Sequence, residues 1–384
     1  MKKILIIHNK YQYVGGEDIA TDKEIQLLSK NYDVETLIYE NSKKELLYTF
    51  LSFFTNTNYK SLKILKKKLK EFNPDIVYIH NTWFKASVGV VNYLLNSDTE
   101  VYLKIHNFRY YCTKSYKAKS HFAETEVCGA CGLSKNDMGI FNKYFPDASI
   151  FKSLFIARYG KKYYQLLKNK KIKLIVLTDF HKKFLIEHGF NKNNISVQRN
   201  NIQTDLPQPL KHKEKTIVYA GRISEEKGVK SIINAFLDSE LSEFNLKIVG
   251  DGPMKKVLEK KFASQRVIFT GELPNNETIK LINRASAVIT GTKLYEGQPT
   301  LLCEASYLRV PSIFPNLGGI HEFFPPSYPL AYQSNDKDDL VDKINKLSNG
   351  NLAEGLKQKN FEHIVDLLDV NSLENNFEKI LNDT

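Results

Sequence analysis

Short apolar runs recur along the first half of the chain, and each is followed by a segment whose apolar residues are spaced as on one face of a helix. These runs are residues 3–9, 33–39, 75–81, 101–107 and 172–178. Strands that alternate with helices pair in parallel, because a parallel pair needs a long crossover connection that is usually a helix. The pattern therefore predicts an α/β domain with a parallel sheet.

The alternation stops at a polar, proline-containing stretch, residues 200–215, and then begins again. The later runs are residues 216–222, 245–250, 266–271, 286–292 and 310–316. We interpret the polar stretch as a linker between two domains, residues 1–203 and 204–369, followed by a helical segment, residues 370–384. Two doubly wound parallel-sheet domains joined in this way are expected to face each other across a cleft, where ligands bind in the loops after the strands.

Length and composition fit two globular domains. The chain has 384 residues, and 42% of them are hydrophobic. This length exceeds that of a domain with a single hydrophobic core. Its four cysteines are too few for a disulfide scaffold and suit a reducing compartment. No apolar run approaches the ~20 residues of a membrane-spanning helix, and the opening run reaches His8 before a secretory core is complete. We therefore expect a cytoplasmic, untargeted protein.

Positive charge is concentrated in the first half of the chain. Residues 1–200 carry 33 lysines and arginines against 18 aspartates and glutamates, whereas residues 201–384 carry 22 against 25. Residues 58–72 place leucines on one helical stripe and lysines around the rest of the surface. Such a helix lies on an anionic membrane surface, or is an ordinary surface helix with solvated lysines. No nucleic-acid-binding motif accompanies the charge, so nucleic acid is not an expected partner.

Two short segments carry glycines or cations at predicted strand ends. Gly15 and Gly16 precede a helix, where glycine lets backbone N–H groups approach a phosphate, although such pairs are often only turns. The dinucleotide fingerprint G-x-G-x-x-G is absent, which disfavours a nicotinamide or flavin cofactor. Arg222 and Lys227 follow a strand of the second domain, where they either hold a diphosphate or pair as loop charges with the neighbouring glutamates.

Residues 292–314, TKLYEGQPTLLCEASYLRVPSIF, place one glutamate in a loop and another on the following helix. The helix is predicted to begin at Thr300, so free N–H groups near residues 298–301 suit a phosphate. Glu296 precedes the helix and Glu304 lies about one turn into it, and carboxylates pair well with sugar hydroxyls. In chain order, Glu296, the helix N-terminus and Glu304 could bind a sugar, a diphosphate and a ribose. Two such glutamates are also compatible with a plain surface helix.

With these motifs, the chain resembles the retaining glycosyltransferases of family four, which have a GT-B fold of two facing Rossmann-like domains. The family's E-x7-E motif corresponds to Glu296 through Glu304. Its G-R-x-x-x-x-K-G motif corresponds to residues 221–228 and its G-x-G-P motif to residues 250–253, in the family's order. The resemblance implies that the first domain binds the acceptor, that the second binds the nucleotide sugar, and that residues 370–384 pack back on the first.

The resemblance also implies roles for individual residues. Arg222 and Lys227 grip the donor diphosphate, Glu296 approaches the transferred sugar, and Glu304 binds the ribose. His106, at the end of a predicted strand, contacts the donor sugar near its anomeric carbon; His8 and His80 have similar positions, but polar residues often terminate strands without such a role. The predicted catalytic residues are His106, Arg222, Lys227 and Glu296. The predicted donor-binding residues are Gly15, Gly16, Arg222, Lys227, Gly252, Glu296, Gly297, Gln298, Pro299, Thr300, Leu301 and Glu304.

Three cysteines after His106 resemble a feature of one branch of these enzymes. Cys112, Cys128 and Cys131 are candidates for a structural zinc site with His106 or His121, but three thiols without an evident fourth partner more often belong to a locally packed loop. The D-x-D string from Asp336 to Asp338 is predicted to cap a helix rather than to bind Mg²⁺. No cofactor and no catalytic metal are therefore expected.

The expected reaction is retaining transfer of a sugar from a nucleotide donor, with a UDP-sugar as the first expectation, to a hydroxyl of a glycan or lipid-linked oligosaccharide. The resemblance places this reaction in the synthesis of a capsule, an O-antigen or a similar surface polysaccharide. A lipid-linked acceptor would explain the basic first domain by peripheral contact with the anionic inner membrane surface. Two alternatives stay open: a nucleotide-sugar epimerase or hydrolase on the same scaffold, and a non-catalytic membrane-binding protein.

Overall fold

The chain folds into two compact units in a computed structural model that describes residues 1–10, 16–40, 52, 55–82, 85–110, 150–202 and 206–382. The described residues up to 201 and those from 370 onward form unit 1. Residues 202 to 369 form unit 2, apart from the few in this range that are not described. The predicted α/β fold class is confirmed in both units.

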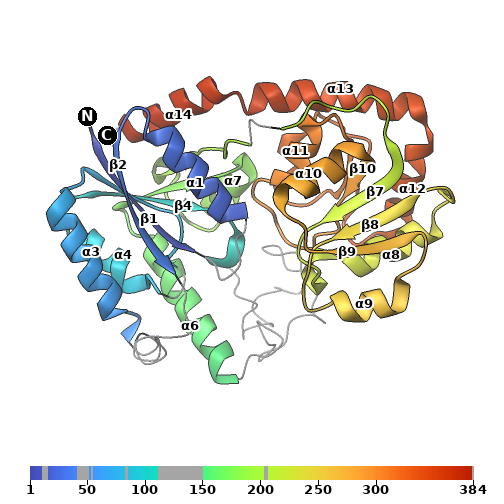
Figure 1. The fold of residues 1–384 in the computed structure, drawn as a ribbon. Coiled ribbons are helices and arrows are strands. Elements are labelled where there is room, and N and C mark those ends of the chain that lie inside the picture. The colour runs from blue at the N-terminus through green and yellow to red at the C-terminus, as the bar shows by residue number, and fades with distance from the viewer. Residues whose placement is uncertain are drawn as a thin grey trace. The chain divides into compact units, whose positions relative to one another are not determined.

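Unit 1 is built around a six-stranded parallel sheet in the order β2-β1-β3-β4-β5-β6 (Figure 1). Its strands are β1 (Lys3–Lys10), β2 (Asp33–Glu40), β3 (Ile76–Ile79), β4 (Glu100–Ile105), β5 (Ile172–Val176) and β6 (Ile195–Val197). Residues 4–7 of β1 are wholly buried, because helices cover both faces of a parallel sheet. This is why the central strands are continuously apolar rather than alternating.

The helices of unit 1 follow the strands, as the sequence predicts. They are α1 (Gly16–Leu28), α3 (Tyr59–Phe72), α4 (Val88–Leu95), α6 (Ile150–Leu167), α7 (Asp179–Glu187) and α14 (Val370–Asn382). The lysine-rich helix predicted over residues 58–72 is α3, and the Asn58 side chain caps it by accepting from the N–H groups of Lys60 and Ser61.

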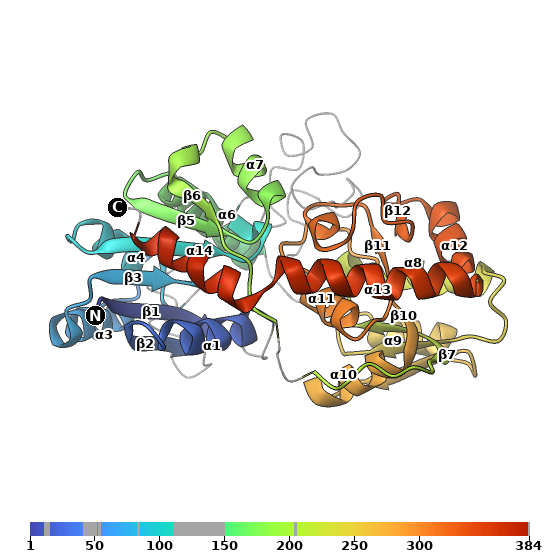
Figure 2. The same cartoon turned by 90° about the horizontal axis from the view of Figure 1, so that it is seen from above.

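The last helix, α14, lies across the sheet of unit 1, which Figure 2 shows from above. Phe377 and Leu381 are 1% and 0% exposed and join a core cluster with Ile4 of β1 and Tyr78 of β3. The Tyr102 hydroxyl donates to the Ile380 carbonyl oxygen at 3.0 Å. Helix α14 and strand β1 therefore contribute side chains to the same hydrophobic core.

Unit 2 contains a second six-stranded parallel sheet, in the order β12-β11-β10-β7-β8-β9. Its strands are β7 (Glu214–Ala220), β8 (Asn245–Val249), β9 (Val267–Gly271), β10 (Ala285–Ile289), β11 (Ser312–Pro315) and β12 (Ala331–Tyr332). Its helices are α8 (Val229–Asp238), α9 (Lys255–Phe262), α10 (Asn275–Arg284), α11 (Thr300–Tyr307), α12 (Lys337–Asn345) and α13 (Gly350–Leu367). As predicted, Asp336 caps α12, its side chain accepting from the Asp339 N–H.

Two strands are absent from the sequence prediction. β6 has three residues and β12 has two, and both are edge strands. Runs this short have no detectable period, so the apolar pattern does not reveal them.

Candidate functional site

The three motif loops of unit 2 leave neighbouring strands. Because β10, β7 and β8 are adjacent and parallel, the segments that follow them emerge at the same edge of the sheet. The Ile223 N–H donates to the Asp251 carbonyl oxygen at 2.8 Å, and the Lys293 N–H donates to the Glu226 carbonyl oxygen at 2.8 Å. Three motifs that are distant in sequence thus form one connected surface.

The glycines of these motifs allow the loops to touch. A Cβ on Gly228 would stand 2.0 Å from the Gly291 carbonyl oxygen, and one on Gly250 would stand 2.0 Å from the Gly221 carbonyl oxygen. A Cβ on Gly252 would stand 2.3 Å from the Ile223 carbonyl oxygen. The φ angles of Gly228, Gly250 and Gly252 are 65°, 131° and 156°, values that side chains disfavour. Loop-to-loop packing alone therefore requires these glycines.

Lys227 and Glu296 form an ion pair on this surface. Lys227 Nζ lies 2.5 Å from Glu296 Oε1, which also accepts from the Thr292 hydroxyl at 2.9 Å. The two charged side chains are 30% and 27% exposed, so an incoming ligand can reach both. Lys227 thus pairs with Glu296 and not with Glu225, whose carboxylate pairs with Lys293.

Arg222 is exposed and stands on a backbone that Tyr219 holds in place. The Tyr219 hydroxyl donates to the Arg222 carbonyl oxygen at 2.7 Å. Burial, together with the charges of Glu296 and Glu226, raises the pKa of Tyr219, so the hydroxyl keeps its proton for this bond. This bond holds the backbone of Arg222 at the end of β7, where the loop that carries Lys227 begins.

The N-terminus of α11 offers fewer free donors than the sequence predicts. The Thr300 N–H donates to the Gln298 carbonyl oxygen, and the N–H groups of Leu302 and Cys303 donate to the Pro299 carbonyl oxygen. The helix begins at Thr300 as expected, and of the N–H groups predicted to be free, that of Thr300 has a local backbone partner. The role of this helix end as an anion site stays a prediction.

Two further parts of the predicted donor site are buried in the structure. Glu304 lies on α11 and is only 6% exposed, and Gly297 is buried in the loop before the helix. Leu301, predicted to be near the anion, is half-buried.

Gly318, in the loop after β11, is a supporting residue that the sequence analysis missed. A Cβ on Gly318 would stand 3.2 Å from Tyr295 Cα and 3.3 Å from the Glu296 backbone nitrogen, and its φ is 65°. The loop therefore packs directly beneath the residue that carries the motif carboxylate. The dipeptide Gly318-Gly319 after an apolar run was the available signal.

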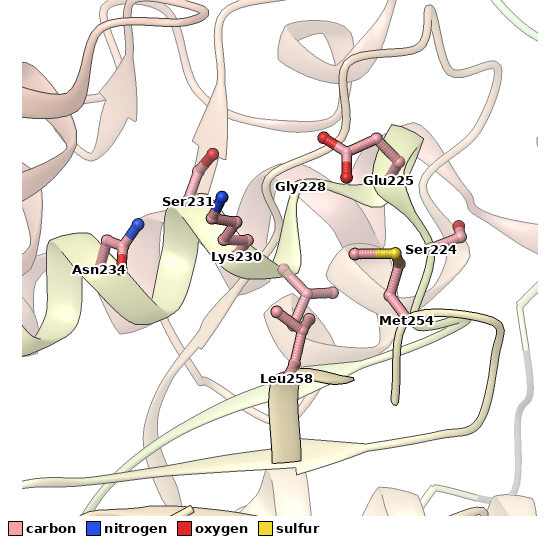
Figure 3. Close-up of a pocket in the computed structure, with 9 residues that line it drawn as sticks. Ser224, Glu225, Gly228, Lys230, Ser231, Asn234, Met254 and Leu258 are labelled. Atoms are coloured by element: carbon pink, nitrogen blue, oxygen red, sulfur yellow. The ribbon is translucent and has the colours of Figure 1, made fainter. Parts of the chain in front are cut away.

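A cavity of about 290 Å³ lies beside these loops (Figure 3). Lys230, Ser231 and Asn234 of α8 line one side of it, and Met254 and Leu258 line the other. The cavity shares Gly228 and residues 224–225 with the motif loop, but Arg222, Lys227, Glu296 and Glu304 do not line it. We therefore place the candidate site at the charged motif surface and not in this cavity.

In unit 1, His106 belongs to a buried polar cluster. Its Nε2 lies 3.1 Å from His80 Nδ1, and the two rings stack with centroids 5.4 Å apart. His80 Nε2 lies 3.5 Å from Glu24 Oε2, while Glu24 Oε1 accepts from Lys104 Nζ at 2.7 Å. Nearby, His8 Nε2 lies 2.7 Å from Asp18 Oδ1. Hence three predicted strand-end histidines share one cluster, and only His106 is half-buried rather than buried.

Burial and nearby cations keep both paired imidazoles neutral. Desolvation, then the charges of Lys104 and His8, lower the pKa of His106 well below its usual value. Desolvation, then His106 and Lys104, do the same to the pKa of His80. His106 and His80 also line a small cavity of about 20 Å³, together with Tyr110 and Tyr163. His106 can therefore offer a ligand one donor or one acceptor, but not a positive charge.

The other predicted positions are distributed as follows. Gly16 begins α1, and apart from its chain neighbours and its own helix backbone, no atom of the described residues lies within 4 Å of a Cβ placed on it. Gly15, Cys112, Cys128, Cys131 and His121 lie outside the described residues. Within the described ranges, no cluster of three histidines, cysteines or acidic residues is arranged to hold a metal ion.

Each unit has a Rossmann-like parallel sheet, and this two-unit fold matches that of solved GT-B glycosyltransferase structures. Residues 201–363, most of unit 2, match the family model of glycosyl transferases group 1. A solved structure of Anabaena HepE in complex with UDP and glucose aligns over 100% of both chains, with a TM-score of 0.69 and 13% identity.

Two curated relatives add partial sequence matches. The chain is 31% identical over 136 residues to TuaC of Bacillus subtilis, whose name describes a glycosyltransferase of teichuronic acid biosynthesis. It is 28% identical over 174 residues to the amylovoran biosynthesis glycosyltransferase AmsD of Erwinia amylovora. These alignments span 35% and 43% of this chain, and 33% and 49% of the relatives. The chain thus spans a third to a half of the length of these two relatives.

Proposed function

We propose that the protein is a retaining glycosyltransferase that moves a sugar from a UDP-sugar to a hydroxyl of a glycan or lipid-linked acceptor in surface-polysaccharide synthesis. The observation that carries this proposal is the Lys227–Glu296 pair at the edge where three motif loops meet. Support also comes from the group 1 match over unit 2 and from the polysaccharide pathways in the relatives' names. The UDP in the HepE structure favours UDP as the donor nucleotide.

In the proposed reaction, negative charge grows on the diphosphate as the glycosidic bond loosens. Arg222 and Lys227 stabilise that charge where it develops, and for this reason we propose turnover without a divalent metal. Glu296 gives up its bond to Lys227 and accepts from sugar hydroxyls, while Glu304 receives the ribose. Glu296 also accepts from the Thr292 hydroxyl, a bond that suits a positioning carboxylate better than a free nucleophile, so we propose retention by front-face attack.

Nucleotide binding tests the donor site. The thermal midpoint is measured with UDP, GDP, ADP and their common sugars, with and without EDTA, because a ligand that binds only the folded state raises the midpoint. We expect a UDP-selective rise that survives EDTA and weakens in Lys227→Ala and Glu304→Ala. Lys230→Ala is the matched control, since this exposed lysine lies three residues away on α8. The absence of a rise with every nucleotide would overturn the proposal.

Product analysis separates the transferase from its rivals. With a UDP-sugar and an acceptor glycan, we expect UDP and a new α- or β-glycoside with the donor's anomeric configuration, read by NMR. Release of free sugar at the same rate without acceptor would favour a hydrolase, and formation of an isomeric UDP-sugar would favour an epimerase. Nucleotide binding with no turnover of any donor would favour a non-catalytic protein.

We propose peripheral membrane contact through α3, which would bring a cytoplasmic enzyme to a lipid-linked acceptor. Its exposed face carries Lys63, Lys66, Lys67 and Lys70, with Tyr59 60% and Ile64 41% exposed among them. The opposite face is fixed in unit 1, since Leu65 and Phe72 are buried. No helix in the described part of the chain is long and apolar enough to cross a membrane.

Vesicle sedimentation tests this contact. We expect the protein to sediment with anionic vesicles and the fourfold Lys→Glu variant at positions 63, 66, 67 and 70 to stay in the supernatant. A fourfold Lys→Glu variant of α9, at positions 255, 256, 260 and 261, makes the same change in net charge on another helix. Equal sedimentation of the α3 variant and the wild type would refute the contact.

A further inference from the structure

Glu24, His80 and His106 form a chain of three polar side chains that ends at the small cavity in unit 1. Glu24 and His80 are 6% and 3% exposed, so no bulk water mediates between them. The distances are 3.5 Å from Glu24 Oε2 to His80 Nε2 and 3.1 Å from His80 Nδ1 to His106 Nε2. Lys104 Nζ, 2.7 Å from the other oxygen of Glu24, stabilises negative charge on this carboxylate.

The order of donors and acceptors along this chain follows from chemistry. Glu24 Oε2 and His80 Nε2 are 3.5 Å apart, in ion-pair contact without a hydrogen bond. The negative charge of the carboxylate therefore favours the proton on the imidazole nitrogen that faces it, Nε2. A neutral His80 then has a bare Nδ1, which can only accept, and His106 must donate from its Nε2. His106 is neutral as well, so its remaining nitrogen, Nδ1, carries a lone pair.

We infer that Glu24 and His80 are positioning residues that fix the tautomer of His106 with Nε2 protonated and Nδ1 free to accept a hydrogen bond from a ligand hydroxyl. The identity of that ligand as a sugar rests on the proposed function. The tautomer itself rests only on the buried chain of contacts. An imidazole held in this state selects a hydroxyl donor and rejects a carbonyl or phosphate oxygen at the same place.

Nitrogen-15 NMR of the imidazole rings tests the tautomer without substrate, with the His80 and His106 signals assigned by comparison with His80→Asn and His106→Asn. In the wild-type protein we expect Nδ1 of both rings to resonate as unprotonated and Nε2 as protonated. The opposite assignment for His106 in the wild type would overturn the inference, whatever the variants do.

Glu24→Gln provides a sharper test because it should reverse the chain. Lys104 keeps donating to the carboxamide oxygen, so the carboxamide NH₂ faces His80 Nε2, which must now accept. His80 Nδ1 then donates to His106, and the His106 proton moves from Nε2 to Nδ1. Asp22→Asn, an exposed acid-to-amide change on the same helix, should leave every imidazole signal in place. A folded Glu24→Gln protein with unchanged His106 signals would contradict the inference.

Turnover separates this inference from the proposed function. If His106 accepts from a sugar hydroxyl, Glu24→Gln should lower kcat/KM roughly tenfold, the scale of one lost hydrogen bond. If NMR shows the predicted tautomers but the protein has no transferase activity, the proposed function is overturned and the positioning roles stand. If the protein has transferase activity but His106 Nδ1 is protonated, the positioning roles are overturned and the proposed function stands.

Discussion

The ammonium of Lys227 lies 2.5 Å from the carboxylate of Glu296, across 69 positions of the chain. Both groups belong to motifs that we propose to bind a nucleotide sugar. In that proposal a bound diphosphate would pair with Lys227 and a bound sugar would pair with Glu296. Donor binding would therefore have to open this ion pair.

A double-mutant cycle on Lys227→Ala and Glu296→Ala measures this contact. Because both side chains are about a third exposed, we expect a coupling of up to about 1 kcal/mol in the free energy of urea unfolding. With saturating UDP, the coupling should shrink towards zero, since the diphosphate replaces the carboxylate. The exposed Lys280–Glu277 pair is the control, and its coupling should not respond to UDP.

The motif glycines yield a second prediction. Gly250→Ala places a Cβ 2.0 Å from the Gly221 carbonyl oxygen at a φ of 131°, so we expect it to destabilise the protein by about 1–3 kcal/mol. Gly355→Ala is the matched control, because Gly355 is exposed within α13 and a Cβ there meets nothing within 4 Å. That change should stabilise the protein by roughly 0.5–1 kcal/mol. Equal midpoints for the two variants in urea would contradict the packing argument.

The fold was predictable because its main determinants are local. Apolar runs such as residues 3–9 and 172–178 are buried strands, and the stretches between them are helices. The lysine-rich helix α3 was found for the same reason, because its apolar stripe recurs at helical spacing. The edge strands β6 and β12 are set by pairing with a neighbour, which no local pattern records.

The candidate site was predictable only in part. Motif spacing located Arg222, Lys227 and Glu296, but it could not show that Lys227 pairs with Glu296 instead of Glu226. Nor could it reveal the buried acids of α1, since Asp18 and Glu24 occupy the inward face of a helix where apolar residues are expected. Their partners are histidines and a lysine on other elements, and only the fold brings these charges together.

His181 should make stability depend on pH. His181 is buried, and its Nε2 shares a hydrogen bond of 2.9 Å with the Tyr110 hydroxyl. Burial lowers the pKa of His181 from 6.5 to about 3. Between these values the unfolded chain binds a proton that the folded chain does not, so stability is lost as pH falls below 6.5. The expected slope is about 1.4 kcal/mol per pH unit for this one group.

Urea unfolding between pH 7.5 and 5 isolates this slope. The stability advantage of wild type over His181→Gln should be smaller at pH 5 than at pH 7.5 by about 2 kcal/mol. His212→Gln, at an exposed position, should show no such change. An advantage of wild type that is constant with pH would mean that His181 titrates normally in the folded protein.

Removal of the Phe377 ring tests whether α14 stabilises unit 1. Phe377 is 1% exposed and packs edge-on to Tyr78 with ring centroids 5.5 Å apart, in a cluster that also contains Ile4 and Tyr102. Phe377→Ala leaves a cavity at the sheet, so we expect a loss of about 3–5 kcal/mol in the free energy of unfolding. Asn375→Ala, at an exposed position on the same helix, should change it by less than about 0.5 kcal/mol. If the two variants unfolded at the same urea concentration, α14 would not contribute to the stability of unit 1. The expected difference would show that α14 is part of the core that supports His80 and His106.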